Sequence, residues 1–184
     1  FKKYVSKNIV DKLLESEDSL NLGGTESEIT ILFSDIRGFT SMSEKLSPTQ
    51  IVNLLNKYFK SMIDVVFKFN GTLDKIVGDE LMVLYGVPLK SEDDTENAIK
   101  TAIQMFKSLD KFNERIIKDG FKPFKIGIGI NKGKAVSGNI GSDQQMNYTV
   151  IGDTINLGAR LCSHAKSGQI LNSNSVKEVI GDNY

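Results

Sequence analysis

Residues 72–85, TLDKIVGDELMVLY, constrain the fold more than any other stretch of the chain. Two β-rich runs, Thr72 to Val77 and Glu80 to Tyr85, are separated by only two residues, Gly78 and Asp79. A glycine at the first position of a two-residue loop is typical of a type II′ turn, which joins neighbouring antiparallel strands. Such a hairpin contradicts a fold built only from alternating parallel βα units.

Helical patterns flank this hairpin on both sides. Residues 47–50 supply a capping Ser, a Pro for the first turn and a Gln that completes a capping box. An apolar stripe at helical spacing follows them and ends at residues 70–71, Asn-Gly. A second long helix carries its stripe from about residue 98 to 118 and stops before Gly120.

The remaining segments complete the predicted order of elements. They are a strand over Glu28 to Ile36, two paired strands over Phe124 to Ile130 and Lys134 to Ile140, a strand over Tyr148 to Ile151, a helix capped by Asp153, a short strand over Gln169 to Leu171 and a helix that starts near Ser175. This order predicts an α+β sandwich with an antiparallel sheet and helices on one face. Residues 1–24 have helix-like spacing and predict a connector helix, so the domain proper covers residues 25–184.

The composition is that of an ordinary globular domain. Of the 184 residues, 40% are hydrophobic and 25% are charged, and 23 basic residues balance 23 acidic ones, so no overall field favours nucleic acid. A single cysteine, Cys162, excludes an intrachain disulfide and suits a reducing compartment, and we expect this domain to be cytoplasmic. The chain begins at Phe1 without Met. We therefore expect a sensor or membrane domain upstream in a longer protein, which leaves open a membrane anchor there.

A strand-end carboxylate and a turn carboxylate are the first candidate site. Asp35 ends the apolar run in ILFSDIRGFT, and Asp79 lies at the tip of the hairpin. If the hairpin pairs beside the first strand, the two side chains meet at one edge of the sheet. Neighbouring carboxylates repel each other unless a cation binds between them, and oxygen ligands suit Mg²⁺ or Mn²⁺. Either aspartate alone is better explained as a structural acid, but together they favour a metal site.

The glycine after Asp35 strengthens this interpretation. Gly38 allows a tight turn into a helix opened by Thr40 or Ser41, whose free N–H groups would face an anion. A second constellation, Asn156 and Arg160, shares one helix face because the two residues are four positions apart. An always-charged Arg suits negative charge that grows on a phosphate in a transition state. Solvated surface residues explain this pair equally well, so its role stays open on spacing alone.

Three blocks of the sequence resemble the signature segments of class III nucleotidyl cyclases, the family of adenylyl and guanylyl cyclases. The blocks are residues 31–40, 75–79 and 149–160, and the resemblance extends over about residues 25–184. It implies a ferredoxin-like palm fold (βααββαβ) that converts a nucleoside triphosphate into a 3′,5′-cyclic nucleotide and pyrophosphate. Family members continue into C-terminal strands that carry a Lys for the triphosphate, so we expect this domain to lack its last strands.

The resemblance also implies a role for each candidate residue. Asp35 and Asp79, with the Ile36 carbonyl, would bind two Mg²⁺ or Mn²⁺ ions per active site. The triphosphate would be held by a short segment made of Gly38, Phe39 and Thr40. Catalysis would rest on two helical residues, with Asn156 orienting the ribose and Arg160 stabilising the reacting α-phosphate. Because the family divides these positions between subunits, the resemblance implies a homodimer with composite active sites.

Base selection falls, by the same resemblance, on Lys75 and Thr149. Guanylyl cyclases tend to carry Glu at the first position, whereas a Lys, which only donates hydrogen bonds, suits the N1 acceptor of adenine. The Thr149 hydroxyl can accept from the 6-amino group of adenine, although many adenylyl cyclases carry Asp there. We therefore expect an adenylate cyclase that uses ATP and acts as the output domain of a signalling protein, with a guanylate cyclase as the alternative.

Other classes of protein compete with this assignment. A diguanylate cyclase shares the palm fold, but it would leave Asn156 and Arg160 without a role. A phosphoacceptor signalling domain would need alternating βα units, which the hairpin contradicts. A catalytically silent, cyclase-like dimerisation module remains the non-enzyme alternative. The chain also departs from the family at Gly127, where some members carry an Arg for phosphate.

Overall fold

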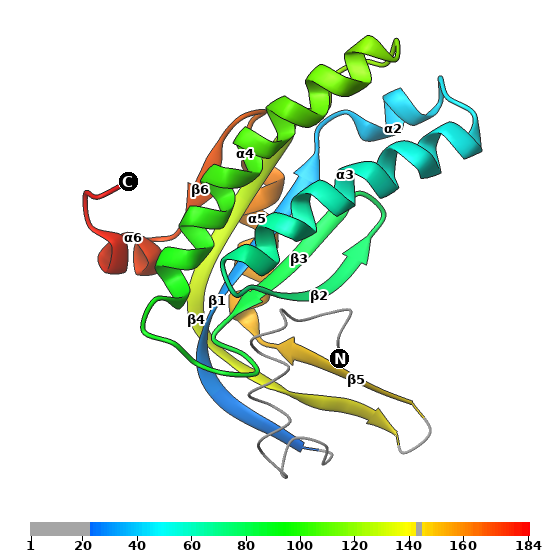
Figure 1. Ribbon diagram of the computed structural model, residues 1–184. Helices are drawn as coiled ribbons and strands as arrows, with labels where there is room; N and C mark the ends of the chain where they lie inside the picture. Colours follow the sequence, from blue (N-terminus) through cyan, green and yellow to red (C-terminus); the bar gives the residue numbers. More distant parts are fainter. Residues whose placement is uncertain (1–22, 143–144) are drawn as a thin grey trace.

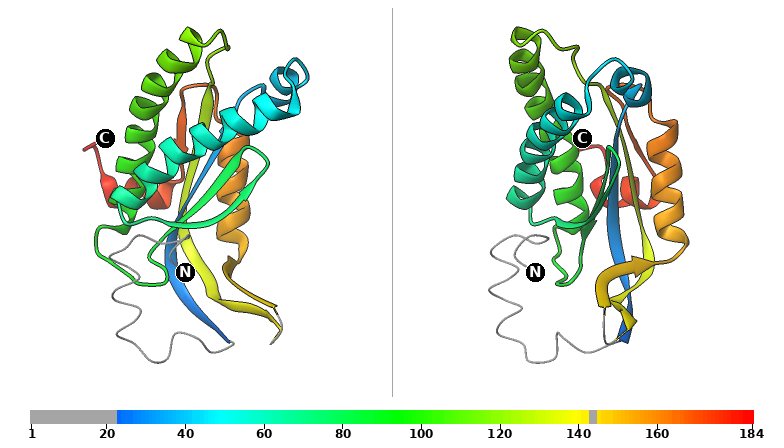
Figure 2. Two further views of the ribbon diagram at one scale, coloured as in Figure 1. Left: turned by 45° about the vertical axis from the view of Figure 1, so that its right-hand side comes forward. Right: turned by 90° about the vertical axis from the view of Figure 1, so that its right-hand side faces the viewer.

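The computed structural model of the protein describes residues 23–142 and 145–184, which form one sheet with helices on both of its faces (Figures 1 and 2). The predicted connector over residues 1–24 lies outside the described residues except for its last two positions, which are already part of the first strand. The prediction of an α+β fold with a mostly antiparallel sheet is confirmed.

The sheet has the order β2-β3-β1-β4-β5, with β6 paired to β4 beside this path. All neighbours are antiparallel except β4 and β6. The strands are β1 (Gly23–Ile36), β2 (Thr72–Val77), β3 (Glu80–Tyr85), β4 (Ile126–Ser142), β5 (Gln145–Ile151) and β6 (Ile170–Asn172). The antiparallel run β2-β3-β1-β4 is the core of the ferredoxin-like palm that the resemblance to class III cyclases implied.

The hairpin β2–β3 has the boundaries that the sequence predicted. Val77 pairs with Glu80 across the turn, and Gly78 has a φ of 62°. The positive φ at the first turn position, which only glycine adopts without strain, explains why the chain reverses at this point. The hairpin lies against β1, because residues 30–34 of β1 pair with residues 81–85 of β3.

The helices are α2 (Phe39–Ser43), α3 (Pro48–Lys68), α4 (Asp94–Lys118), α5 (Asp153–His164) and α6 (Asn174–Ile180). The predicted capping box of α3 is present: the Ser47 hydroxyl accepts from the Gln50 N–H, and the Gln50 side-chain oxygen accepts from the Ser47 N–H. In α4, acidic residues occupy the first turn and basic residues the last, in agreement with the helix dipole.

Helix α5 lies on the opposite face of the sheet from α3 and α4, as the right-hand view of Figure 2 shows. The prediction that the helices cover one face was therefore wrong. Successive side chains of β1 alternate between two cores: Leu32 packs with α3 and α4, whereas Ile31 and Phe33 pack with α5. Because both faces are covered, Ile31, Leu32 and Phe33 are all apolar, and the strand shows no regular alternation that would have revealed the second layer.

Strand β4 is one strand of 17 residues, not the predicted pair of strands. It pairs with β1 without interruption from Gly23 opposite Asn139 to Ile36 opposite Ile126. Residues 131–133 lie between the two predicted strands, and there the buried Asn131 amide donates to the Thr154 carbonyl of α5 at 2.9 Å. The polar side chain is thus satisfied inside the fold, and the strand continues through it.

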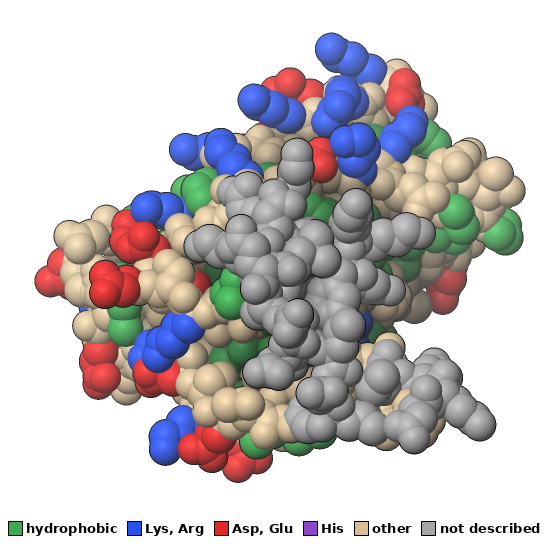
Figure 3. All heavy atoms as spheres, turned by 60° about the horizontal axis from the view of Figure 1, so that its bottom comes forward, with side chains coloured by type: hydrophobic (Ala, Val, Ile, Leu, Met, Phe, Trp, Pro, Cys, Tyr) green, Lys and Arg blue, Asp and Glu red, His purple; other side chains and the backbone are tan. Residues whose placement is uncertain are grey.

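The surface carries charges of both signs. Lys and Arg side chains are concentrated in the upper part of Figure 3, and both signs occur around the rest of that face. Within the described ranges, no helix combines the length and the hydrophobicity that crossing a bilayer requires.

Candidate active site

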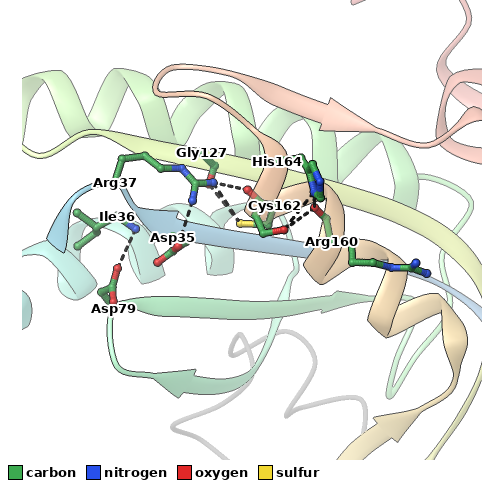
Figure 4. A network of polar contacts seen from close by, with 9 residues as sticks. Asp35, Ile36, Arg37, Asp79, Gly127, Arg160, Cys162 and His164 are labelled. Atoms are coloured by element: carbon green, nitrogen blue, oxygen red, sulfur yellow. Dashed lines mark hydrogen bonds and ion pairs between the residues drawn. The ribbon is translucent and has the colours of Figure 1, made fainter. Parts of the chain in front are cut away.

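The end of β1 and the tip of the β2–β3 hairpin meet at one edge of the sheet. The pairing of Ser34 with Leu81 carries Asp35 to the start of β3, next to the turn that holds Asp79. One oxygen of Asp79 accepts a hydrogen bond from the Ile36 N–H at 3.0 Å (Figure 4). The structure therefore brings the two aspartates and Ile36 together, as the sequence led us to expect.

Negative charge is crowded at this edge. Burial raises the pKa of Asp35 to about 7, and the neighbouring Asp79 carboxylate adds to the rise while Arg37 opposes it. The pKa of Glu80 is also raised, first by burial and then by Asp79. An excess of buried carboxylate charge is the environment that a divalent cation relieves, so these residues fit a metal ion. The ligand set is small: among the described residues no cluster of three His, Cys, Asp or Glu side chains surrounds a common point.

Arg37 belongs to this network, although the sequence reasoning did not select it. Its guanidinium pairs with Asp35 at 3.2 Å and donates a second hydrogen bond to the Cys162 carbonyl of α5 (Figure 4). A Cβ atom at Gly127 would clash with the same guanidinium, so the absence of a side chain there makes room for it. At Gly127, where some family members carry an Arg, the space is therefore occupied by the guanidinium of Arg37, which follows β1. The two-residue spacing from Asp35 was the signal that could have revealed this contact.

The turn after Arg37 differs in detail from the prediction. Gly38 has a φ of 71°, in the left-handed region, and precedes the five-residue helix α2. The helix begins at Phe39, earlier than the predicted start at Thr40 or Ser41. The Phe39 side chain packs against the core beneath α3 and α4, so this residue can offer a phosphate only its backbone. Gly38 and Thr40 are exposed beside it.

Asn156 and Arg160 lie one turn apart on α5, and both are exposed. The predicted shared face is therefore present. Figure 4 shows the Arg160 side chain directed away from Asp35 and Asp79. Its carbonyl accepts hydrogen bonds from Ser163 and from the His164 ring at 2.8 Å, which accounts for the only histidine of the chain as a helix-end contact. One chain does not gather the carboxylates and the Arg160 guanidinium at one point.

Lys75 and Thr149 lie on β2 and β5, the two ends of the strand order. The Lys75 side chain is half exposed, and its ammonium lies 3.3 Å from the carboxylate of Asp74. The Thr149 hydroxyl is buried and has no hydrogen-bond partner in the part of the chain that the structure describes. Asp74 was not among the residues that the sequence singled out.

The structure also contains a polar cavity of about 290 Å³ between α3 and α4. Its charged lining residues are Asp64, Lys68, Lys111 and Arg115, none of which was predicted to belong to the site. The carboxylate pair lies instead at the strand and hairpin ends, so this cavity plays no part in the arrangement described above.

Comparison with known proteins agrees with this geometry. The family described as "Adenylate and Guanylate cyclase catalytic domain" matches residues 24–183. Adenylate cyclase 1 of Rhizobium meliloti is 33% identical over 161 residues, and the adenylate cyclase of Anabaena cylindrica is 35% identical over 167 residues. Each alignment covers 88% of this chain but only 24% and 32% of the respective relative. The chain thus spans about a quarter to a third of their length.

Two solved structures share the fold closely. The guanylyl cyclase Cya2 is 42% identical with a TM-score of 0.85, and the alignment covers 88% of this chain and 82% of that one. The adenylyl cyclase CyaB from P. aeruginosa is 38% identical with a TM-score of 0.84, covering 88% and 84%. The family match over nearly all described residues and these two structures lead to one conclusion. The chain belongs to the family of adenylate and guanylate cyclase catalytic domains.

Proposed function

We propose that this domain is an adenylate cyclase that converts ATP into 3′,5′-cyclic AMP and pyrophosphate. In this reaction the ribose 3′-oxygen forms a bond to the α-phosphorus. The bond between the α-phosphorus and the oxygen that bridges it to the β-phosphorus breaks, and pyrophosphate and a proton are released. The observation that carries the proposal is the meeting of Asp35 and Asp79, held by the Ile36 N–H, at the edge of a cyclase palm. The two curated relatives named above, both called adenylate cyclases, support it.

The carboxylate pair is the proposed holder of two Mg²⁺ or Mn²⁺ ions, together with the Ile36 carbonyl. Bound there, the ions would neutralise phosphate charge and lower the pKa of the 3′-hydroxyl. Hard oxygen donors and the raised pKa of Asp35 support this assignment. Arg37 holds Asp35 in place from the side of α5. The backbone of residues 38–40 would hold the triphosphate beside the ions.

The remaining roles require a second subunit. Asn156 would orient the ribose and Arg160 would stabilise charge on the α-phosphate, yet the Arg160 side chain points away from the carboxylates of its own chain. We therefore propose a two-fold homodimer in which each active site takes its carboxylates from one subunit and Asn156 and Arg160 from the other.

Guanylate cyclase activity is the second candidate, because the Cya2 structure that resembles this chain at 42% identity is a guanylyl cyclase. The base-reading residues favour ATP. Lys75 offers only donors, which match the N1 acceptor of adenine and oppose the N1–H of guanine. Overall similarity thus points to both nucleotides, and the chemistry at this one position separates them.

The decisive experiment incubates the purified domain with ATP or with GTP in the presence of Mn²⁺ and separates the cyclic products by chromatography. We expect cyclic AMP from ATP and at most a minor yield of cyclic GMP. Asp79→Ala, checked by circular dichroism for an intact fold, should yield neither product. High protein concentration favours the dimer by mass action. If the wild-type domain makes no cyclic nucleotide under these conditions, the domain is a catalytically silent, cyclase-like dimerisation module.

A further inference from the structure

Asp74 carries a buried negative charge that the proposed function does not use. Its side chain is only 1% exposed, and neither carboxylate oxygen has a hydrogen-bond partner among residues 23–142 and 145–184. Among the described residues it is the only carboxylate in this condition. A buried carboxylate that accepts no hydrogen bond is unfavourable in folded proteins, so its environment calls for an explanation.

The nearest opposite charge is Lys75, the next residue in the strand. In a regular strand successive side chains point to opposite faces, so an ion pair between neighbours is unusual. Here the pairing of β2 with β3 shifts register between Leu73 and Lys75, which places an irregularity at Asp74. Such bulges redirect side chains. This one lets the Lys75 ammonium lie 3.3 Å from the Asp74 carboxylate.

The two members of this ion pair differ in their surroundings. Asp74 is buried, whereas the Lys75 side chain is 50% exposed, so the ammonium sits between a buried acceptor and open space. An ammonium group has three donors, and contact with one carboxylate leaves others free for a ligand. The charge of Asp74 also reaches β5: burial raises the pKa of the Tyr148 phenol, and Asp74 adds to the rise. Tyr148 directly precedes Thr149 in that strand.

We propose that Asp74 is a positioning residue for base selection. It fixes the Lys75 ammonium so that this group donates to N1 of adenine, and in this way it contributes to the choice of ATP over GTP. The inference rests on the proposed function and adds a residue to it. Because Asp74 acts through Lys75, its effect depends on the presence of the N1 acceptor in the nucleotide.

Three nucleotides test this dependence with the isosteric, uncharged variant Asp74→Asn. ATP has both N1 and the 6-amino group, purine riboside triphosphate lacks the amino group, and 1-deaza-ATP lacks the N1 acceptor. We expect Asp74→Asn to lower kcat/KM roughly tenfold for ATP and for purine riboside triphosphate, mainly through KM, in keeping with one lost charge-assisted contact. With 1-deaza-ATP the variant and the wild type should be equal.

Binding of 3′-deoxy-ATP, which has no 3′-hydroxyl and cannot cyclise, gives a readout that is independent of turnover. Calorimetry should show the same loss of affinity in Asp74→Asn. The matched control is Asp64→Asn, which removes an exposed carboxylate from an ion pair on α3 and should change neither measurement. If Asp74→Asn melts early, Asp74→Glu keeps the charge but displaces it, and the same pattern over the three nucleotides is expected.

Other outcomes would overturn the assignment. A loss with ATP that disappears with purine riboside triphosphate would mean that Asp74 contacts the 6-amino group directly. Equal losses with all three nucleotides would mean a structural role. A wild-type domain that neither cyclises ATP nor binds 3′-deoxy-ATP would refute the proposed function itself. An active wild type matched by Asp74→Asn would refute only the role of Asp74.

Discussion

Asp35 holds the most unfavourable charge of the carboxylate pair. It is partly buried, it faces Asp79, and one arm of the Arg37 guanidinium is its only ion-pair partner among the described residues. The same arginine must also satisfy the Cys162 carbonyl on α5. The residue is therefore arranged for binding a cation at the expense of stability when none is bound, a common pattern at functional sites.

This conflict predicts that Asp35→Asn stabilises the metal-free domain. Because the pKa of Asp35 is raised from 3.8 to about 7, folding favours the protonated acid, and stability falls as the pH rises through that window. At pH 8 in EDTA, Asp35 is ionised and its destabilisation of the fold is fully present. Replacing it with Asn should raise Tm by about 2–4 °C for each kcal/mol gained in the free energy of unfolding. Thermal melts at pH 8 and pH 5 should show a smaller gain at pH 5.

Asp64→Asn is the control for this measurement, because its carboxylate is exposed and its ion pair with Lys60 contributes little. Added Mn²⁺ should raise the Tm of the wild type but not that of Asp35→Asn. A lower Tm for Asp35→Asn at pH 8 would show instead that the pair with Arg37 outweighs the repulsion by Asp79.

At the scale of elements, two glycines allow α5 to pack closely against the sheet. A Cβ atom at Gly129 of β4 would collide with the backbone of Cys162, and one at Gly158 of α5 would press on Ile31 and Phe33. The close approach fixes the height of α5 above β4, and α5 carries Asn156 and Arg160. The position of both predicted catalytic residues thus depends on the absence of a side chain at Gly129.

We therefore expect Gly129→Ala to destabilise the domain by about 1–3 kcal/mol, the usual effect of overpacking, and to reduce cyclase activity strongly. Gly127→Ala should be milder, because the added methyl group meets the Arg37 side chain, which can move. Urea unfolding measures both effects. Arg37→Ala should relieve the destabilisation caused by Gly127→Ala and leave that of Gly129→Ala unchanged; equal relief of both would contradict this account.

The same elements show which parts of the fold and of the candidate site could be predicted from the sequence. The hairpin, α3 with its capping box, and the meeting of Asp35 with Asp79 were predicted, because each rests on local turn and capping chemistry or on simple strand order. The second helical layer was missed, because a strand covered on both faces has no polar alternation. Arg37 and Asp74 were missed because their roles depend on contacts across the fold and on a bulge.

At the scale of the whole molecule, the proposed catalytic groups of one chain are separated. The carboxylates lie at the β1 and hairpin ends, whereas the Arg160 side chain leaves α5 in another direction (Figure 4). The proposed two-fold dimer would resolve this separation, because each subunit would then complete the site of its partner.

This arrangement predicts that two inactive variants restore each other. Asp35→Ala and Arg160→Ala are each expected to be inactive, but in a mixed dimer one site collects both lesions and the other collects none. With equal amounts and free exchange, half of the dimers are mixed and each has one good site, so about a quarter of wild-type activity should return. Cyclic AMP assays at high protein concentration measure the recovery, and a tag on one variant verifies exchange.

Mixing Asp35→Ala with Asp79→Ala is the matched negative control, because both lesions lie in the same half of the site and no dimer then contains an intact one. If exchange is verified and the first mixture also stays inactive, the sites are not shared between subunits.

The long pairing of β1 with β4 has a consequence for synthesis of the chain. The partners are separated by roughly a hundred residues, so the central strand β1 leaves the ribosome long before its partner exists. At about 5–20 residues per second, this delay lasts roughly 5–20 s. Before β4 is made, the only neighbouring strand that β1 can pair with is β3 of the hairpin, which is itself synthesised after β1. The other edge of the apolar run around Ile31 is then open to chaperones or to neighbouring nascent chains.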